Sequence, residues 1–164
     1  MLLEDSLRGV AVVSGFEGSI VDVGSGGGVP GIPLATSLPD REVTLLEAIG
    51  RKCDFLREWA PANVLVVQGR AEEQETDAYG VAVAKALAKP PVAAEWCLPL
   101  VRPGGAVVLW VGPSVDTERV ARVAEQVGGE LAAEGDGFLV LLKVRPTPEG
   151  FPRRPGVASK RPLD

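Results

Sequence analysis

The sequence predicts an α/β fold with one open, mostly parallel sheet that ends in an antiparallel hairpin. Two observations predict this fold. Between residues 20 and 111, short β-branched and apolar runs alternate with helix-length segments, as happens when crossover helices join parallel strands. Two further apolar runs flank Gly135-Asp136-Gly137, a turn sequence typical of hairpins. The length of 164 residues and the hydrophobic content of 46% suit one domain with a single core.

The first strand and the turn after it carry the clearest signal. Ile20–Val23 has the β-branched, apolar character of a buried parallel strand. A glycine-rich turn over residues 24–28 follows it. The helix expected at Gly31–Ser37 has prolines at its start, which the first turn of a helix tolerates. Open α/β sheets bind nucleotide-like ligands at such a junction, so we expect a ligand beside the glycines.

The remaining elements follow at the spacing of a parallel sheet. Apolar runs predict the strands, and apolar residues at helical intervals predict the helices between them. Pro103-Gly104-Gly105 predicts a turn into the fifth strand. In total, we expect further strands at 43–46, 64–67, 79–84, 106–111, 130–133 and 138–144, and helices at 51–60, 90–100 and 115–127.

An acidic residue follows the glycine turn at a sequence spacing typical of nucleoside-binding sites. The pattern D-x-G-x-G-x-G is formed by Asp22, Gly24, Gly26 and Gly28. Glu47 follows Gly28 by 19 residues, at the end of the second strand. A carboxylate about 20 residues on reaches the ribose hydroxyls of a ligand in the crevice. Because glycine lacks a Cβ, the turn lets backbone N–H groups approach that ligand closely.

The glycine pattern alone leaves the identity of the nucleoside open. Residues 26–31 also fit G-x-G-x-x-G, the dinucleotide fingerprint. However, the turn begins two residues earlier, and Pro30 removes a backbone N–H that a pyrophosphate would use. S-adenosylmethionine carries no phosphate, so we expect this cofactor. Its methionine part would lie at the glycines, its ribose at Glu47 and its adenine at the loop after the third strand.

Composition excludes several kinds of chemistry. Histidine is absent, which excludes Ser-His-Asp and Cys-His catalysis, and two cysteines cannot complete a tetrahedral zinc site, so no metal is expected. Cys53 and Cys97 lie far apart with no signal peptide before them, which indicates reduced, packed thiols in a cytoplasmic protein. No apolar run reaches the roughly 18 residues of a membrane-spanning helix.

Charge is distributed unevenly along the chain. The formal net charge is −5, yet residues 143–164 hold six basic and two acidic residues. We divide the chain into a main domain at 1–145 and a basic, Pro/Arg-rich tail at 146–164. A basic segment on an acidic domain indicates a localised contact with a polyanion. The candidate phosphate contacts are Arg153, Arg154, Lys160 and Arg161.

Several blocks of the sequence together resemble one family. They are DVGSGGGVPGIPLA from Asp22, TLLEAIGRKCDFLR from Thr44, GRAEE from Gly69, RPGG from Arg102 and FPRRPG from Phe151. In this order and spacing, over residues 3–163, they resemble the ribosomal RNA small subunit methyltransferase G family, also called glucose-inhibited division protein B. The resemblance implies a class I S-adenosylmethionine-dependent methyltransferase fold, which is Rossmann-like. It also implies methylation of N7 of a guanine in 16S rRNA or the 30S ribosomal subunit. We expect no membrane contact and a monomer, although the sequence does not give the oligomeric state.

The resemblance also assigns residues. The family's cofactor contacts fall on Gly24, Val29, Ala71, Glu72 and Lys85. At position 85 the family has arginine, and lysine keeps the charge but lacks the planar fork for bidentate contacts. Together with the glycine pattern and the acidic residue, the expected cofactor set is Asp22, Gly24, Gly26, Gly28, Val29, Glu47, Ala71, Glu72 and Lys85.

No catalytic base is expected for this reaction. N7 of guanine carries a lone pair in the ring plane and attacks a methyl group without first losing a proton. The enzyme would therefore contribute alignment and an environment that tolerates the cationic purine. A chain without histidine can do this. Lys85 is a candidate contact with substrate or cofactor, and the alternative is a strand-end lysine that extends its charge to solvent.

The chain departs from the family's pattern in further places. Family members carry an N-terminal helical segment, and residues 1–7 resemble its end, so we expect a truncated chain. Val111 stands where the family has lysine, and Gly80 where it has an acidic residue. We expect cofactor binding to persist and transfer to the guanine to be weakened or redirected. The alternative functions are a non-catalytic S-adenosylmethionine-binding protein associated with the ribosome and a nicotinamide-dependent oxidoreductase.

Aromatic and basic residues outside the tail are assigned to structure. Trp59, Trp96 and Trp110 could stack a base, but each lies in an apolar-periodic segment, so we expect them in the core. Arg51 and Lys52 could add a phosphate contact. As an isolated charged pair at the start of a helix, they are expected to face solvent.

Overall fold

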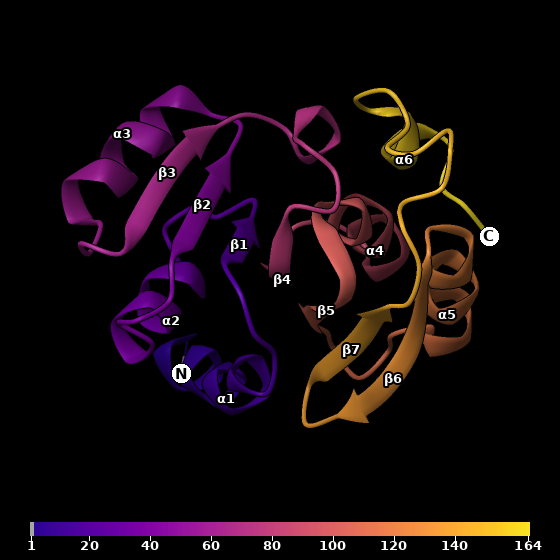
Figure 1. The fold of residues 1–164 in the computed structure, drawn as a ribbon, viewed down its shortest axis with the longest axis horizontal. Coiled ribbons are helices and arrows are strands. Elements are labelled where there is room, and N and C mark those ends of the chain that lie inside the picture. The colour runs from indigo at the N-terminus through magenta and orange to yellow at the C-terminus, as the bar shows by residue number, and fades with distance from the viewer. Residues whose placement is uncertain (1) are drawn as a thin grey trace.

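The structure, a computed structural model, describes residues 2–164 as a seven-stranded sheet with helices against both faces (Figure 1). The strand order is β3-β2-β1-β4-β5-β7-β6, with parallel pairing except where β7 runs antiparallel to β5 and β6. The strands are β1 Ile20–Val23, β2 Val43–Glu47, β3 Val64–Gln68, β4 Tyr79–Lys85, β5 Val101–Trp110, β6 Gly129–Gly135 and β7 Phe138–Lys143. The helices are α1 Leu2–Ser14, α2 Gly31–Ser37, α3 Gly50–Trp59, α4 Pro90–Cys97, α5 Thr117–Gln126 and α6 Val157–Lys160, with the 3-10 turns η1 Ala71–Glu73 and η2 Leu98–Leu100.

This architecture confirms the predicted fold class and each strand and helix expected from the sequence. Small differences at element ends have local causes. The helix expected at 90–100 is α4 followed by the tighter turn η2. The helix expected at 115–127 begins two residues later, because the carboxylate of Asp116 accepts a hydrogen bond from the Arg119 N–H at 3.0 Å and caps α5.

Both glycine turns expected near the C-terminal half are present. In the hairpin, Asp136 (φ 53°) and Gly137 (φ 83°) join β6 to β7 with the positive φ angles that two-residue hairpin turns require. The turn at residues 103–105 is an insertion within β5, since Tyr79 pairs with Val101 while Val81 pairs with Ala106.

Gly80 lies beside this insertion, where the chain has no space for a side chain. A Cβ at Gly80 would lie 2.0 Å from the carbonyl oxygen of Glu17, and a Cβ at Gly105 would lie 2.2 Å from the carbonyl oxygen of Gly80. The acidic residue that the family pattern has at this position therefore cannot be accommodated in this packing. Glycine at position 80 is a requirement of the local backbone approach.

Helix α1 extends further than the sequence indicated. Its start resembled the end of a helical segment, but the helix continues to Ser14 because its inner face packs closely on the sheet. Val13 is fully buried, and a Cβ at Gly9 would lie 2.4 Å from the ring of Trp110. The Trp110 Nε1 donates a hydrogen bond to the Asp5 carbonyl at 3.1 Å, which ties the helix to the end of β5.

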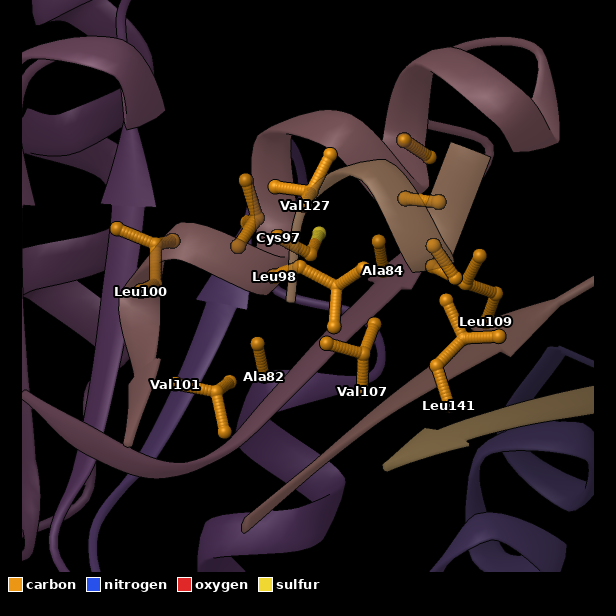
Figure 2. Close-up of a cluster of buried hydrophobic side chains, with 14 of the residues drawn as sticks. Ala82, Ala84, Cys97, Leu98, Leu100, Val101, Val107, Leu109, Val127 and Leu141 are labelled. Atoms are coloured by element: carbon orange, nitrogen blue, oxygen red, sulfur yellow. The ribbon is translucent and has the colours of Figure 1, made fainter. Parts of the chain in front are cut away.

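Two hydrophobic clusters hold the helices to the two faces of the sheet. In the cluster of Figure 2, side chains of β4, β5 and β7 meet α4, η2 and Val127 just after α5. The other cluster packs α1, α2 and α3 against the opposite face through residues such as Val13, Leu34 and Leu56. Cys53 and Cys97 are buried, unpaired thiols, as predicted.

A buried lysine closes the end of β7. Lys143 is 1% exposed, and its Nζ lies 2.7 Å from Asp77 Oδ1 and 2.8 Å from Thr147 Oγ1. The same atom lies 2.8 Å from the carbonyl oxygens of Leu98 and Val101. A buried ammonium group is tolerated here because every donor has an oxygen partner.

The tail packs back over the domain along its length. Phe151 and Leu163 contact the cluster of Figure 2, and Arg119 on α5 donates to the Leu163 carbonyl at 2.9 Å. Arg153 forms a two-pronged ion pair with the buried Glu95 on α4, at 2.5 and 2.6 Å. In Figure 1 the tail and α6 accordingly lie against the main body, close to α4.

The tryptophans divide between the core and the surface. Trp110 is half-buried and packs edge-on against Phe138, with ring centroids 5.0 Å apart. The expectation for Trp59 is wrong, since 64% of this residue is exposed at the end of α3. Sequence periodicity could not identify the outer face of α3, because β3, against which α3 packs, is the edge strand of the sheet. Within residues 2–164, the structure contains no helix with the length and apolar character to cross a membrane.

We expect Lys143→Ala to lower the free energy of unfolding by about 3–5 kcal/mol, because it removes the buried ammonium group that the Asp77 carboxylate and two carbonyls share. Urea titration followed by circular dichroism measures the loss. Lys89→Ala, at an exposed lysine, is the control and should change stability by less than about 0.5 kcal/mol. Equal losses in the two variants would contradict the assignment.

Candidate functional site

The strand order reverses at β1, which lies between β2 and β4. The loops after β1, β2, β3 and β4 therefore meet at one edge of the sheet, where open α/β sheets bind ligands. A cavity of about 560 Å³ lies there, within the size range of small-molecule sites. Seven of the nine predicted cofactor residues line it: Gly24, Gly26, Val29, Glu47, Ala71, Glu72 and Lys85.

The glycine turn forms one wall of this cavity. The N–H groups of Gly24 and Ser25 both donate to the Leu46 carbonyl, at 2.8 and 3.1 Å, which fixes the turn against the end of β2. Gly24 has a φ of 70°, and a Cβ there would lie 2.4 Å from the side chain of Leu87. At Gly27 an added Cβ would meet nothing within 4 Å, so the turn leaves open space on the cavity side.

Glu47 lies at the carboxyl end of β2 and faces the glycine turn. Its Oε1 accepts a hydrogen bond from the Gly26 N–H at 3.1 Å, and its Oε2 accepts one from the Ile49 N–H at 2.9 Å. The residue is 6% exposed. Each carboxylate oxygen can accept more than one hydrogen bond, so both retain capacity for a ligand hydroxyl.

Asp22 and Gly28 lie outside the cavity lining, although the sequence pattern placed them with the cofactor. The Asp22 carboxylate is 1% exposed and accepts a hydrogen bond from the Gly31 N–H at 3.0 Å. Gly28 has a φ of 92°, and a Cβ there would lie 2.6 Å from Ile32 Cδ1. Both residues therefore shape the turn.

The loop after β3 joins the cavity to the tail. Ala71 is buried, and Glu72 has a side chain that is 4% exposed. The Glu72 Oε1 accepts a hydrogen bond from the Gly156 N–H at 3.2 Å, and its Oε2 lies 3.7 Å from Arg70 Nε. Glu72 thus holds the cavity loop against the tail, a contact between segments that are 84 residues apart.

Lys85 ends β4 and lines the opposite wall. Its Nζ lies 3.7 Å from Asp5 Oδ2 of α1, beyond hydrogen-bond distance, and is buried without a hydrogen-bond partner among the residues that the structure describes. A buried charged donor without such a partner is unfavourable until a ligand or water supplies an acceptor. Lys85 is therefore an under-satisfied cation in the cavity wall.

The four basic residues predicted in the tail do not act alike. Arg153 is engaged by Glu95 and holds the tail to α4. Arg154, Lys160 and Arg161 are exposed. Only these three present their charge to a partner from the tail.

Several residues that line the cavity were not predicted as site residues from the sequence. Ile49 and Lys52 at the start of α3, Leu87 after β4 and Trp96 on α4 all line the cavity. The rule that loops at a strand-order reversal meet could have indicated Ile49 and Lys52. No local pattern in the sequence indicated that Trp96 lines the cavity, because its position depends on how α4 packs in the tertiary structure.

The site suits a nucleoside-like ligand that carries both a positive and a negative charge. It offers acceptors at Glu47 and Glu72, cations at Lys52, Arg70 and Lys85, and apolar contacts at Leu46 and Leu87. Within residues 2–164, no group of three His, Cys, Asp or Glu side chains is arranged to hold a metal ion.

Burial raises the pKa of Asp22 to about 7, against the hydrogen bonds that favour its charged form. Between pH 4 and pH 7 the folded chain therefore holds a proton that the unfolded chain has released. Stability should fall across this window as pH rises, by roughly 4 kcal/mol from this group. We expect Asp22→Asn, measured by denaturant titration at a series of pH values, to remove this slope. The exposed-site control, Asp40→Asn, should keep it.

The comparisons with known proteins agree on one family. The family profile described as rRNA small subunit methyltransferase G matches residues 1–128. The chain is 37% identical over 186 residues to the "Ribosomal RNA small subunit methyltransferase G" of Symbiobacterium thermophilum, covering 97% of this chain and 76% of the relative. It is 39% identical over 172 residues to the protein of that name from Rubrobacter xylanophilus, covering 89% and 65%.

Among solved structures, the fold is similar to that of M. jannaschii TYW2 in complex with AdoMet. The TM-score is 0.66 at 19% identity, and the match covers 86% of this chain and 73% of that one. This likeness supports the class I methyltransferase fold. The profile and the relatives together establish that the chain belongs to the rRNA small subunit methyltransferase G family.

Proposed function

We propose that this chain transfers the methyl group of S-adenosylmethionine to N7 of a guanine in 16S ribosomal RNA. The observation that carries the proposal is the cavity at the strand-order reversal, where a glycine turn faces the buried carboxylate of Glu47. Membership of the methyltransferase G family supports the reaction and the substrate. The protein would act in the cytoplasm, on free rRNA or on the 30S subunit.

Each wall of the cavity suits one part of the cofactor. The glycine turn, at Gly24, Gly26 and Val29, accommodates the methionine part, with open space at Gly27. Glu47 accepts hydrogen bonds from the ribose hydroxyls with the lone pairs that Gly26 and Ile49 leave free. The loop at Ala71 and Glu72 lies beside the adenine.

S-adenosylmethionine supplies an electrophilic methyl group on a positively charged sulfur. The N7 lone pair forms a bond to the methyl carbon as the carbon–sulfur bond breaks. The electron pair of the broken bond stays with sulfur. The positive charge passes to guanine, and no proton moves. The chain's contribution is alignment, worth up to about 7–11 kcal/mol in well-oriented systems, in an environment that tolerates the cationic purine.

The tail supports the RNA contact. Arg154, Lys160 and Arg161 are exposed, and Gly156 between them touches Glu72 of the cavity loop. Phosphates bound by these side chains would therefore lie close to the cavity mouth. RNA would present its guanine from a loop or junction, because side chains cannot enter the narrow major groove of an A-form helix.

A second candidate is a cofactor-binding member of the family without this transfer activity. Two observations favour it: Lys85 replaces the family's arginine and lies beside Asp5, and Val111 packs against the core where the family has lysine. The nicotinamide-dependent oxidoreductase is disfavoured by the antiparallel β6–β7 hairpin and by the family match.

Methyl transfer tests the first candidate directly. Tritiated S-adenosylmethionine is incubated with the protein and with 16S rRNA or 30S subunits that lack the family's methylation, and the labelled base is mapped. Label at guanine N7 is the expected result. Cofactor binding by calorimetry without label would favour the second candidate, and no binding would overturn both.

We expect Glu47→Gln to weaken S-adenosylmethionine binding by about tenfold or more, because a charged acceptor of two hydroxyl groups becomes a neutral one. Isothermal titration calorimetry measures the Kd. Glu42→Gln, at an exposed residue just before β2, should leave the Kd unchanged. An unchanged Kd for Glu47→Gln would place the ribose elsewhere.

We expect Lys85→Met to weaken cofactor binding by about tenfold through loss of the charged donor, whereas Lys85→Arg should bind at least as tightly as the native chain. The same calorimetry applies, with Lys89→Met as the exposed control. If Lys85→Met binds as the native chain does, Lys85 only pairs with Asp5.

A further inference from the structure

Helix α3 carries two exposed aromatic rings side by side. Phe55 is 50% and Trp59 is 64% exposed, and their ring centroids lie 6.4 Å apart at an interplanar angle of 46°. Leaving two large rings in water forgoes the favourable burial that aromatic side chains usually find. Adjacent exposed rings therefore indicate a surface that a partner covers.

These rings lie on one face of α3 with two basic residues. At 100° per residue, Arg51, Lys52, Phe55 and Trp59 fall within an arc of about 100°. We call these four residues the aromatic stripe. Its first turn adjoins the cavity, because Lys52 and the preceding Ile49 line the cavity wall. In Figure 1, α3 begins near the edge where β2 ends and runs beside β3.

Charge on the stripe is concentrated at its cavity end. Arg51 and Lys52 are both exposed, whereas Arg57 lies on another face and pairs with Asp54 at 3.2 Å. Glu58 borders the stripe. Helix α3 carries three basic and two acidic residues in a chain whose net charge is −5, so this surface is locally positive.

We propose that the aromatic stripe binds unpaired RNA nucleotides next to the target base. Bases stack on Phe55 and Trp59, and Arg51 and Lys52 contact the phosphates that lead to the cavity. Stacking on aromatic rings beside basic residues is how proteins hold single-stranded nucleic acid. This inference rests on the proposed function, and it assigns a second RNA contact in addition to the tail.

The position of the stripe favours RNA over a protein partner. A protein or a second copy seated on the stripe would also cover the cavity at Ile49 and Lys52, and the proposed transfer needs that cavity open. A single strand that crosses the stripe instead delivers its base there. The tail approaches the cavity separately, at Glu72, so the RNA would be held at two points beside its target base.

The test compares RNA and cofactor parameters in variants of the full chain. The double variant Phe55→Ala, Trp59→Ala should raise the KM for 30S subunits or 16S rRNA about tenfold, and leave the Kd of S-adenosylmethionine within about twofold. Trp59→Phe should largely retain the native KM, since it keeps an aromatic face. Leu65→Ala is the matched control, because Leu65 is 55% exposed but points to the opposite face of the sheet from α3.

Arg51→Gln adds a readout specific to phosphate binding. It should weaken RNA binding equally for different sequences and reduce the slope of log Kd against log salt by about one. Direct binding is measured by fluorescence anisotropy with a labelled single-stranded RNA, which needs no methyl transfer. Circular dichroism checks that each variant is folded.

The outcomes separate this inference from the proposed function. Methylation by the native chain with an unchanged KM and anisotropy in the double variant would overturn the stripe and leave the function standing. If the native chain does not methylate the RNA, the proposed function is overturned. The anisotropy measurement would still show whether the aromatic stripe binds RNA. If the double variant changes only the sedimentation of the protein, the stripe is a contact between copies and the inference is wrong.

Discussion

The buried hydrogen bond between the Gly31 N–H and the Asp22 carboxylate sets the geometry on which the cavity depends. It joins the end of β1 to the first residue of α2 and so fixes how the intervening glycines run. No side chain fits at Gly31, because a Cβ would lie 2.2 Å from Leu45 and 2.6 Å from the Asp22 carboxylate. Burial disfavours the charged form of Asp22, so this arrangement lowers the stability of the fold near neutral pH.

Acidic side chains connect the separate elements that form the cavity walls. Glu47 ties the glycine turn to the start of α3 through two backbone N–H groups. Glu72 ties the loop after β3 to Gly156 of the tail, and Glu95 ties α4 to Arg153. Part of the acidic content of this chain is thus structural. On α3 and in the tail, by contrast, the basic residues Arg51, Lys52, Arg154, Lys160 and Arg161 are exposed.

The departures from the family pattern differ in their structural consequences. Gly80 lies where the backbone of Glu17 leaves no room for a side chain, and Val111 packs against the core while its N–H donates to the Gly137 carbonyl at 2.8 Å. Neither residue lines the cavity. Lys85 does line it, and its neighbour Asp5 belongs to α1. Of these three positions, only Lys85 lines the cavity, and it does so beside α1.

The sequence by itself determined the order of strands and helices, the glycine turn and the place of Glu47, because periodicity, turn residues and spacing act over a few residues. The tertiary structure alone decided that Arg153 pairs with Glu95 and that Glu72 holds Gly156, since these partners are 58 and 84 residues apart. It also decided that Trp59 faces outward. The buried face of a helix depends on the sheet beneath it, and β3, the edge strand beside α3, leaves the outer rings of Phe55 and Trp59 uncovered.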